Sequence, residues 1–126
     1  MSRLMSVSLT EQAVVERRKT VTRRKGWRFL RPGDRLTLCR KVMGRKLGDP
    51  LVRLAEVEVV DVRREPLSAI TSEDIEHEGV PATVWASSDH QATCCSCRSA
   101  CWAGWYARTM GGRADQQVTR IEWRYL

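Results

Sequence analysis

The sequence predicts an α+β fold in which a small, strongly curved sheet or barrel carries two or three helices. Three observations lead to this prediction. The chain has 126 residues, which is enough for one domain with a single core. Alternating apolar and polar residues predict strands in the middle and at the end of the chain. Capping residues mark helical segments near the start and after the long central strand, and no repeat or low-complexity linker divides the sequence.

The first predicted elements are a short strand and a helix. Residues 6–9 can begin as a strand, after which Ser8 or Thr10 caps a helix that runs to about Arg18. Glu11 follows Ser8 by three residues, which is the spacing of a capping box.

A loop or short strand comes next, because residues 20–22 are all β-branched. Pro32 and Gly33 then predict a type II turn, with proline setting φ and glycine accepting a positive φ. Residues 35–42 alternate and predict a strand with one largely apolar face.

The longest predicted strand covers residues 51–64. Val57 and Val59 share one face, whereas Val60 and Val62 share the other. This change of phase predicts either a β-bulge or a strand that is buried on both sides.

A short helix and a closing strand complete the predicted elements. Thr71 caps a helix over residues 72–78, with Asp74 at capping-box distance and Gly79 ending the helix. Residues 117–126 alternate again and predict the last strand.

Charge is divided unevenly along the chain. The formal net charge is +7 and the pI is about 9.6, which favours an anionic partner. Residues 17–46 contain thirteen Lys or Arg, whereas residues 56–78 contain eight acids. This segregation predicts a basic face.

Residues 17–31, here called the basic block, hold eight cations and no acid. Isolated buried charges are very costly, so the block cannot be an ordinary core segment. A solvated basic loop is the simple interpretation. The interleaved aromatics favour a nucleic-acid site in a solvent-open mouth of the barrel, with cations for phosphates and rings for bases. The residues predicted to bind RNA or DNA are Arg17, Arg18, Lys19, Arg23, Arg24, Lys25, Trp27, Arg28 and Arg31.

The basic block also resembles a known family. Residues 18–24 (RKTVTRR), Gly26-Trp27 and residues 30–34 (LRPGD) resemble the ASCH domain of the PUA-like superfamily, especially small ASCH proteins of actinobacterial phages. Residues 60–66, 78–81 and 118–123 fit the same pattern. The resemblance implies one ASCH domain over residues 1–126, built as a small mixed or antiparallel β-barrel of PUA type with two or three flanking helices. It also implies nucleic-acid binding, of RNA in most proposals, in a cleft beside the barrel.

One branch of that family deacylates N4-acetylcytidine with a Lys/Thr/Glu trio, whose positions by resemblance are Lys19, Thr22 and Glu78. A threonine hydroxyl needs a neighbouring base. Lys19 can act as that base only if it is partly neutral, and the surrounding arginines lower its pKa. Glu78 would orient the lysine or shuttle a proton. The structural alternative places Thr22 in a turn, Lys19 on phosphate and Glu78 in a salt bridge to the basic block.

The resemblance fails over residues 84–106, which are rich in cysteine and tryptophan. His90, Cys94, Cys97 and Cys101 would align on one face of a helix. The outer two would then be about 16 Å apart, too far for one zinc site. A core helix that uses cysteine as a small hydrophobe is favoured, with zinc and redox roles as alternatives. We expect no metal and no cofactor.

These observations lead to two hypotheses: a phosphate-driven, weakly sequence-specific nucleic-acid-binding module, or an amidohydrolase acting on N4-acylated cytosine nucleosides. The sequence does not choose between RNA and DNA and says nothing of oligomeric state. It contains no apolar run of the roughly 18 residues that cross a membrane and no signal-peptide pattern at its start. We therefore expect a cytoplasmic protein, in the host cytoplasm if a phage encodes it.

Overall fold

The computed structural model describes residues 3–40, 48, 50–85 and 98–126. Their elements in chain order are β1 (Arg3–Ser6), η1 (Ser8–Thr10), α1 (Glu11–Val15), β2 (Val21–Arg24), β3 (Arg35–Cys39), β4 (Arg53–Pro66), η2 (Leu67–Ala69), α2 (Ser72–Glu78), α3 (Ala82–Trp85), α4 (Arg98–Met110) and β5 (Gln117–Tyr125). This arrangement confirms the predicted α+β class. None of the helices in these ranges has the length and hydrophobicity of a membrane span.

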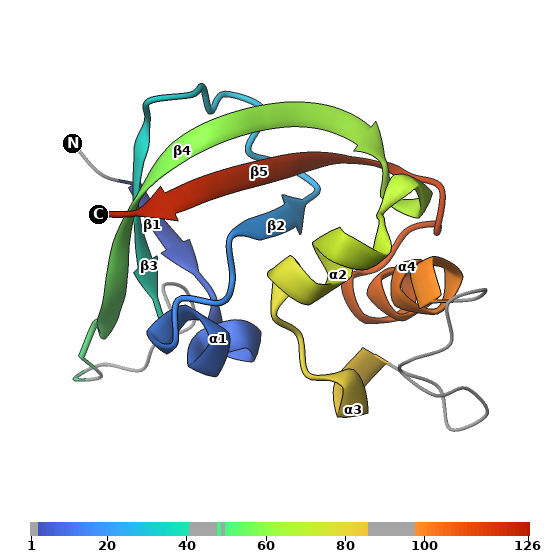
Figure 1. The fold of residues 1–126 in the computed structure, drawn as a ribbon, viewed down its shortest axis with the longest axis horizontal. Helices are drawn as coiled ribbons and strands as arrows, with labels where there is room; N and C mark the ends of the chain where they lie inside the picture. Colours follow the sequence, from blue (N-terminus) through green and yellow to red (C-terminus); the bar gives the residue numbers. More distant parts are fainter. Residues whose placement is uncertain (1–2, 41–47, 49, 86–97) are drawn as a thin grey trace.

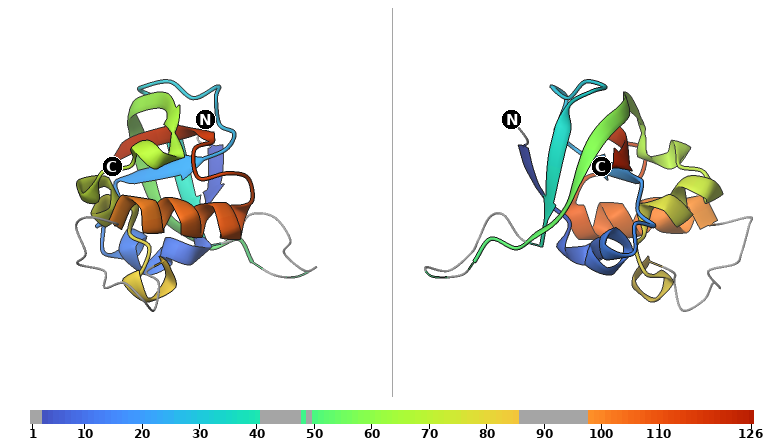
Figure 2. Two further views of the ribbon diagram at one scale, coloured as in Figure 1. Left: turned by 90° about the vertical axis from the view of Figure 1, so that its right-hand side faces the viewer. Right: turned by 60° about the vertical axis from the view of Figure 1, so that its left-hand side comes forward.

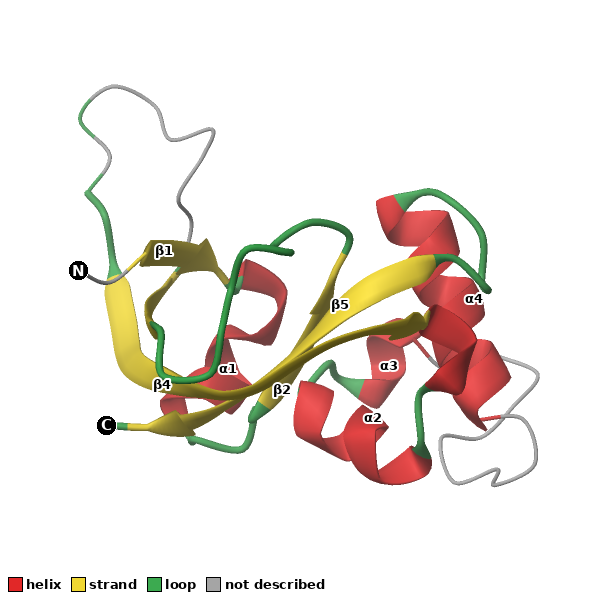
Figure 3. Ribbon diagram, turned by 90° about the horizontal axis from the view of Figure 1, so that it is seen from above, coloured by secondary structure: helices red, strands yellow, loops and turns green. Residues whose placement is uncertain are grey.

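The strands form one curled, mixed sheet in the order β1-β3-β4-β5-β2 (Figure 1). Only β1 and β3 run parallel within the described sheet, and the other neighbouring pairs are antiparallel. The long strands β4 and β5 pair from Val57 and Tyr125 to Pro66 and Gln117. Helices α2, α3 and α4 gather at one end of this pair, and β1 and β3 lie at the other end (Figures 1 and 3). The sheet is therefore half of a barrel, with helices beside its end.

A β-bulge bends β4 where the valine pattern changes phase. The register with β5 shifts between Val59 and Asp61, so Val60 has no partner there. Val59 is 1% exposed and Val60 is 45% exposed. The bulge prediction is therefore confirmed. The strand itself begins and ends about two residues later than predicted.

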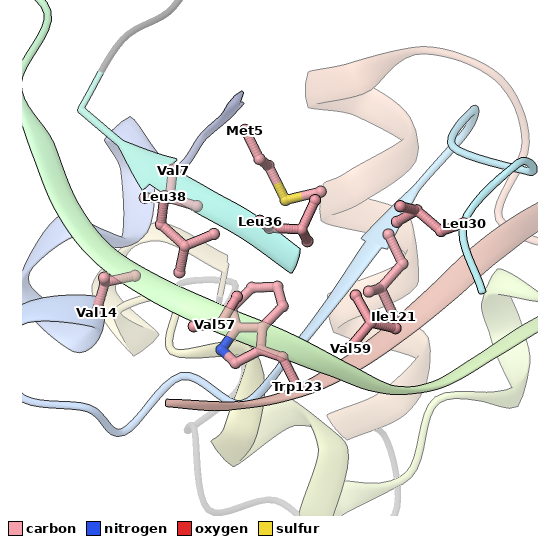
Figure 4. Close-up of a cluster of buried hydrophobic side chains, with 10 residues drawn as sticks. All are labelled: Met5, Val7, Val14, Leu30, Leu36, Leu38, Val57, Val59, Ile121 and Trp123. Atoms are coloured by element: carbon pink, nitrogen blue, oxygen red, sulfur yellow. The ribbon is translucent and has the colours of Figure 1, made fainter. Parts of the chain in front are cut away.

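Two hydrophobic clusters stabilise the fold. In the first, side chains of Met5, Leu36, Leu38, Val57 and Trp123 point toward one another within the curl of the sheet (Figure 4). The second joins α4 to η2, α2 and the start of β5 through residues that include Trp102 and Val118. The second cluster fixes α4 beside the sheet end (Figure 2).

The first helix is shorter than predicted and is not capped by Ser8. Residues 8–10 form a 3-10 turn, and no side-chain cap is present at either helical start. The helix stops early because Arg17 has a positive φ of 60°. The Arg18 N–H donates to Ala13 O at 2.8 Å and the Arg17 N–H to Val14 O at 2.9 Å. These two bonds are those of a Schellman motif, which turns the chain into β2.

The first strand was predicted three residues too late: β1 covers Arg3–Ser6 rather than residues 6–9, because residues 8–10 form the 3-10 turn. The predictions for α2 and for the turn at residues 31–34 agree with the structure. Thr71 Oγ1 accepts from the Asp74 N–H at 3.1 Å, and Gly79 closes α2 with a φ of 76°. The Asp34 N–H donates to Arg31 O across the predicted turn, where Gly33 has a φ of 96°. Residues 86–97 lie outside the described residues, so the predicted helix is seen only from Arg98 onward.

Candidate functional site

A cavity of about 360 Å³ lies where β2, the end of α2 and α4 meet. Its walls combine the predicted trio with basic and aromatic side chains, among them Lys19, Thr22, Arg24, Glu78, Trp105 and Tyr106. The structure therefore brings all three residues of the trio to one cavity, although 59 positions separate Lys19 from Glu78.

Lys19 is a buried lysine, with 2% of its surface exposed. Its Nζ donates to Glu78 O at 2.6 Å and lies 3.4 Å from Glu78 Oε1. Its backbone oxygen accepts from Trp123 Nε1 at 3.0 Å, which ties the residue to β5. Burial lowers the pKa of Lys19 to about 8, against the opposing effect of the Glu78 charge. The lysine is thus partly neutral near neutral pH.

Thr22 stands in β2 with a buried side chain. Its Oγ1 accepts from Arg24 Nε at 3.2 Å, so both side chains lie on the same face of β2. Arg24 Nη2 also donates to Ser6 O at 2.7 Å. Burial lowers the pKa of this guanidinium. Arg24 therefore lines the cavity in a fixed position.

Arg23 lies in a different environment from the one that the sequence predicts. Its side chain has no exposed surface and is surrounded by acids of the 56–78 region. Its Nη1 is 3.0 Å from Glu78 Oε2 and its Nη2 is 2.6 Å from Asp74 Oδ2. Since strand residues alternate, Arg23 points away from the face of Thr22 and Arg24. Arg23 is therefore not part of an exposed phosphate-binding surface.

These contacts form a buried chain of alternating charges that runs from Lys19 through Glu78, Arg23 and Asp74 to Arg120. Arg120 Nε and Nη2 donate to Asp74 at 2.8 and 3.0 Å. The hydrogen bond from Arg120 holds the pKa of Asp74 well below its usual range, and Arg23 acts in the same direction. Glu78 is thereby held between two cations. Asp74 and Arg120 were not predicted as parts of this site, because no short-range signal in the sequence marks them.

The other cations of the basic block are exposed, and of these only Lys25 lines the cavity. Arg17 and Arg18 precede β2, whereas Lys25, Arg28 and Arg31 follow it. Arg17 lies over the Tyr125 ring at 5.5 Å, and Arg18 pairs with Glu16 at 2.6 Å. The expectation that the whole block lines one mouth is therefore wrong, and the cavity takes only part of it.

The aromatic side chains of the cavity come from α4 rather than from the basic block. Trp27 is partly buried against the first cluster and lies 5.4 Å from the Phe29 ring, so its exposure to a base is limited. Trp102, Trp105 and Tyr106 of α4 instead form a cavity wall, and Tyr106 Oη donates to Arg23 O at 3.2 Å. The spacing of aromatics over residues 102–106 is the sequence signal for this wall.

No group of three or more His, Cys, Asp or Glu suited to a metal occurs in the described part of the chain. His90, Cys94 and Cys97 of the predicted stripe lie outside the described residues. Cys101 is partly buried on α4 and Cys39 is buried in β3.

Solved structures with a similar fold include the following two. A protein from Enterococcus faecalis V583, described as DUF984, has a TM-score of 0.59 with 12% identity, over 100% of this chain and 76% of that one. The ASCH domain from Lactobacillus crispatus JV V101 has a TM-score of 0.53 with 9% identity, over 98% of this chain and 79% of that one. The fold is that of an ASCH domain.

At such low identity the ASCH fold is what the comparison shows, and it carries no residue roles to this chain. Both similar structures come from bacteria, so they give no support to the predicted phage origin. No protein-family model matches the sequence, and a search of curated proteins finds no similar sequence.

Proposed function

We propose that this ASCH-fold protein binds single-stranded nucleic acid and takes one unpaired base into the cavity. RNA is the first ligand to test. The observation that carries this proposal is the composition of the cavity wall, where Arg24 and Lys25 face the same space as Trp105 and Tyr106. A volume of about 360 Å³ lies within the range of about 300–1,000 Å³ that is typical of ligand pockets. Proteins that read single strands combine stacking rings with cations for phosphates. The ASCH fold is consistent with an RNA-binding module.

The test is fluorescence polarisation with a labelled RNA octamer over a series of KCl concentrations. We expect the affinity to fall steeply with salt, because phosphate contacts release counterions. The variant Lys25→Glu should weaken binding, since Lys25 lines the cavity. Arg40→Glu is the matched control: Arg40 is exposed and pairs with Glu11 at 2.7 Å, and it does not line the cavity. Failure to bind at low salt, or equal effects of the two variants, would contradict the proposal. A DNA octamer of the same sequence measures the preference for RNA.

The second candidate function is hydrolysis of an N4-acylated cytosine nucleoside. It is favoured by the contact between Lys19 and Glu78 and by the lowered Lys19 pKa of about 8. At pH 7 about a tenth of such a lysine is neutral and can accept a proton. The Thr22 hydroxyl would attack the acyl carbon while Lys19 takes its proton, and the cytosine amine would leave with that proton. Water would then hydrolyse the acyl-threonine.

This candidate predicts a particular dependence of rate on pH. Because the active form of Lys19 is neutral, kcat/KM with N4-acetylcytidine should rise about tenfold per pH unit below 8 and level off above it. The measurement is chromatographic detection of released cytidine. Lys19→Ala should abolish release. A wild-type protein without turnover, or a Lys19→Ala variant with normal turnover, would exclude hydrolysis while leaving RNA binding open.

Both functions suit a cytoplasmic protein, in the host if a phage encodes it, and this location stays a prediction. So does the assignment of the exposed cations of the basic block to phosphate contacts.

A further inference from the structure

Three cations lie together where the chain leaves β2, and they come from two separate segments. Lys25 and Arg28 follow β2, and Arg64 belongs to β4 opposite Thr119 of β5. Within the described ranges, none of the three forms an ion pair with a carboxylate. The neighbouring Arg63, by contrast, lies 3.2 Å from Glu65 Oε1.

Arg64 is held in place by neutral acceptors, so these bonds leave its positive charge uncompensated. Its Nη1 donates to Lys25 O at 3.0 Å and to Thr119 Oγ1 at 2.8 Å, and its Nη2 donates to Gln117 O at 3.2 Å. A guanidinium has five N–H donors, of which these bonds use three. The two that remain are Nε–H and one Nη2–H, and N–H donors on these two nitrogens can bind two oxygens of one phosphate.

The positive charges of Lys25, Arg28 and Arg64 add to one another. Partial burial and the nearby charge of Arg28 lower the pKa of Arg64. Arg28 itself is exposed and follows Trp27, whose positive φ of 61° redirects the chain. Like charges that are held close without a counterion attract an anion strongly.

The same corner adjoins the cavity. Lys25 lines the cavity, and its Nζ donates to the backbone oxygen of Met110, a half-exposed residue that also lines the cavity. Thr119 Oγ1 donates to Gly26 O at 2.6 Å, so Thr119 and Arg64 together pin the turn at residues 25–26 to the sheet. The last residue of β2, Arg24, pairs with Thr119 of β5, which on its other side pairs with Arg64 of β4. A ligand in the cavity therefore meets this corner at the rim.

We propose that Lys25, Arg28 and Arg64 form a phosphate site, here called the phosphate corner, beside a base held in the cavity. The inference rests on the proposed nucleic-acid function and narrows its ligand class. The preferred ligand is a phosphorylated nucleotide or a strand, rather than a free nucleoside. Arg64 supplies donors held by its bonds to the sheet and turn, Arg28 supplies an exposed charge, and Lys25 supplies a charge at the cavity wall.

The experiment uses the polarisation assay with the RNA octamer over a KCl series, for the wild type and three variants. Arg28→Gln is the cleanest change, because no hydrogen bond or ion pair of Arg28 is seen in the described part of the chain. We expect it to weaken binding at low salt and to reduce the slope of log K against log salt by about one. Arg28→Gln combined with Arg64→Gln should reduce the slope by about two. Arg40→Gln removes the same charge elsewhere and should leave the slope unchanged.

A competition arm tests the ligand class. Cytidine 5′-monophosphate should displace the RNA from the wild type at a concentration about tenfold lower than cytidine does. Arg28→Gln combined with Arg64→Gln should abolish that difference. RNA binding with an unchanged slope in both corner variants would overturn the phosphate corner and leave the proposed function standing. A wild type that binds no RNA at low salt would overturn both.

Discussion

Arg23 and Arg24 are neighbours in the sequence, yet their surroundings differ. Arg23 forms ion pairs with Glu78 and Asp74, whereas Arg24 donates to Thr22 Oγ1, although both arginines line the cavity. The alternation of strand side chains accounts for the separation, because β2 has the acids of α2 on one side. A single strand thus supplies both a buried ion-pair partner and a cavity residue.

Lys19 illustrates how a lysine is tolerated inside a protein. Burial of an ammonium group is costly, and two oxygens of Glu78 compensate it only in part. The pKa of Lys19 therefore falls to about 8. Between this value and the ordinary 10.5, the folded state releases a proton that the unfolded chain keeps, so the burial cost of Lys19 declines as the pH rises through this window.

At the residue scale we predict the effect of Glu78→Gln. The substitution removes the one acid between Lys19 and Arg23 and leaves both cations with less compensation. Breaking such a buried pair costs about 3 kcal/mol of unfolding free energy, measurable by urea denaturation. Because the Glu78 charge raises the Lys19 pKa, this pKa should fall below 8 in the variant, which NMR titration of the lysine side chain would detect.

The matched control is Glu73→Gln, on the same helix but exposed. It should change the free energy of unfolding by no more than about 0.5 kcal/mol. Equal losses of unfolding free energy in the two variants would show that the Glu78 carboxylate does not stabilise the buried cations.

At the scale of elements, two helix ends place Lys19. The Schellman motif after α1 turns the chain toward β2, and the end of α2 packs directly against it. A Cβ added at Gly79 would lie 2.5 Å from the Ala13 Cβ and 3.3 Å from the Lys19 Cβ. Only glycine permits this approach, which brings the Glu78 carbonyl to the Lys19 ammonium.

We therefore predict that Gly79→Ala is more damaging than Gly33→Ala. Both glycines have a positive φ, of 76° and 96°, which costs alanine roughly 1–2 kcal/mol. Nothing lies within 4 Å of a Cβ at Gly33, so only this backbone cost applies there. Gly79→Ala adds the clash with Ala13, for a further loss of about 1–3 kcal/mol.

Chemical denaturation of the two variants measures the difference directly. Gly79→Ala should also shift the Lys19 pKa, since the lysine backbone must move, whereas Gly33→Ala should not. Similar stabilities and similar Lys19 titrations in the two variants would contradict the packing argument.

At the scale of the whole molecule, the charge chain joins elements that are distant in sequence. Asp74 of α2 binds Arg23 of β2 and Arg120 of β5, and the last contact spans 46 positions. Since the pKa of Asp74 is lowered in the folded state, its contribution to stability is present above the unfolded pKa near 4. That contribution is lost as the pH falls below this value.

We predict that the free energy of unfolding of Asp74→Asn depends less on pH below 4 than that of the wild type. At pH 7 the variant should be about 3 kcal/mol less stable than the wild type, because two buried arginines lose a charged partner. The gap should narrow as the pH falls below 4, because the unfolded wild type takes up a proton at Asp74 that the folded wild type does not bind. Urea denaturation at a series of pH values gives the comparison. Asp115→Asn, at an exposed pair with Arg113, should leave the profile unchanged.

Much of the local structure was predictable because it depends on residues within a few positions of one another. Thr71, Asp74 and Gly79 bound α2 as expected, Pro32 and Gly33 make the turn, and Val59 and Val60 mark the bulge. The end of α1 was missed because Arg17 adopts a left-handed conformation for which its residue type carries no signal. Lys19, Thr22 and Glu78 were predicted from a resemblance in the sequence. That they line one cavity is known only from the tertiary structure.

The sequence by itself determined the α+β class, the strand and helix pattern and the supply of basic residues. The reason is that propensity, periodicity and capping act locally. Only the tertiary structure decided which charges are paired. Lys19 and Glu78 are 59 positions apart, Arg23 and Glu78 are 55 apart, and Arg64 reaches back 39 positions to Lys25. Burial and neighbouring carboxylates set the pKa of each cation, and both depend on the folded structure rather than on neighbours in the sequence.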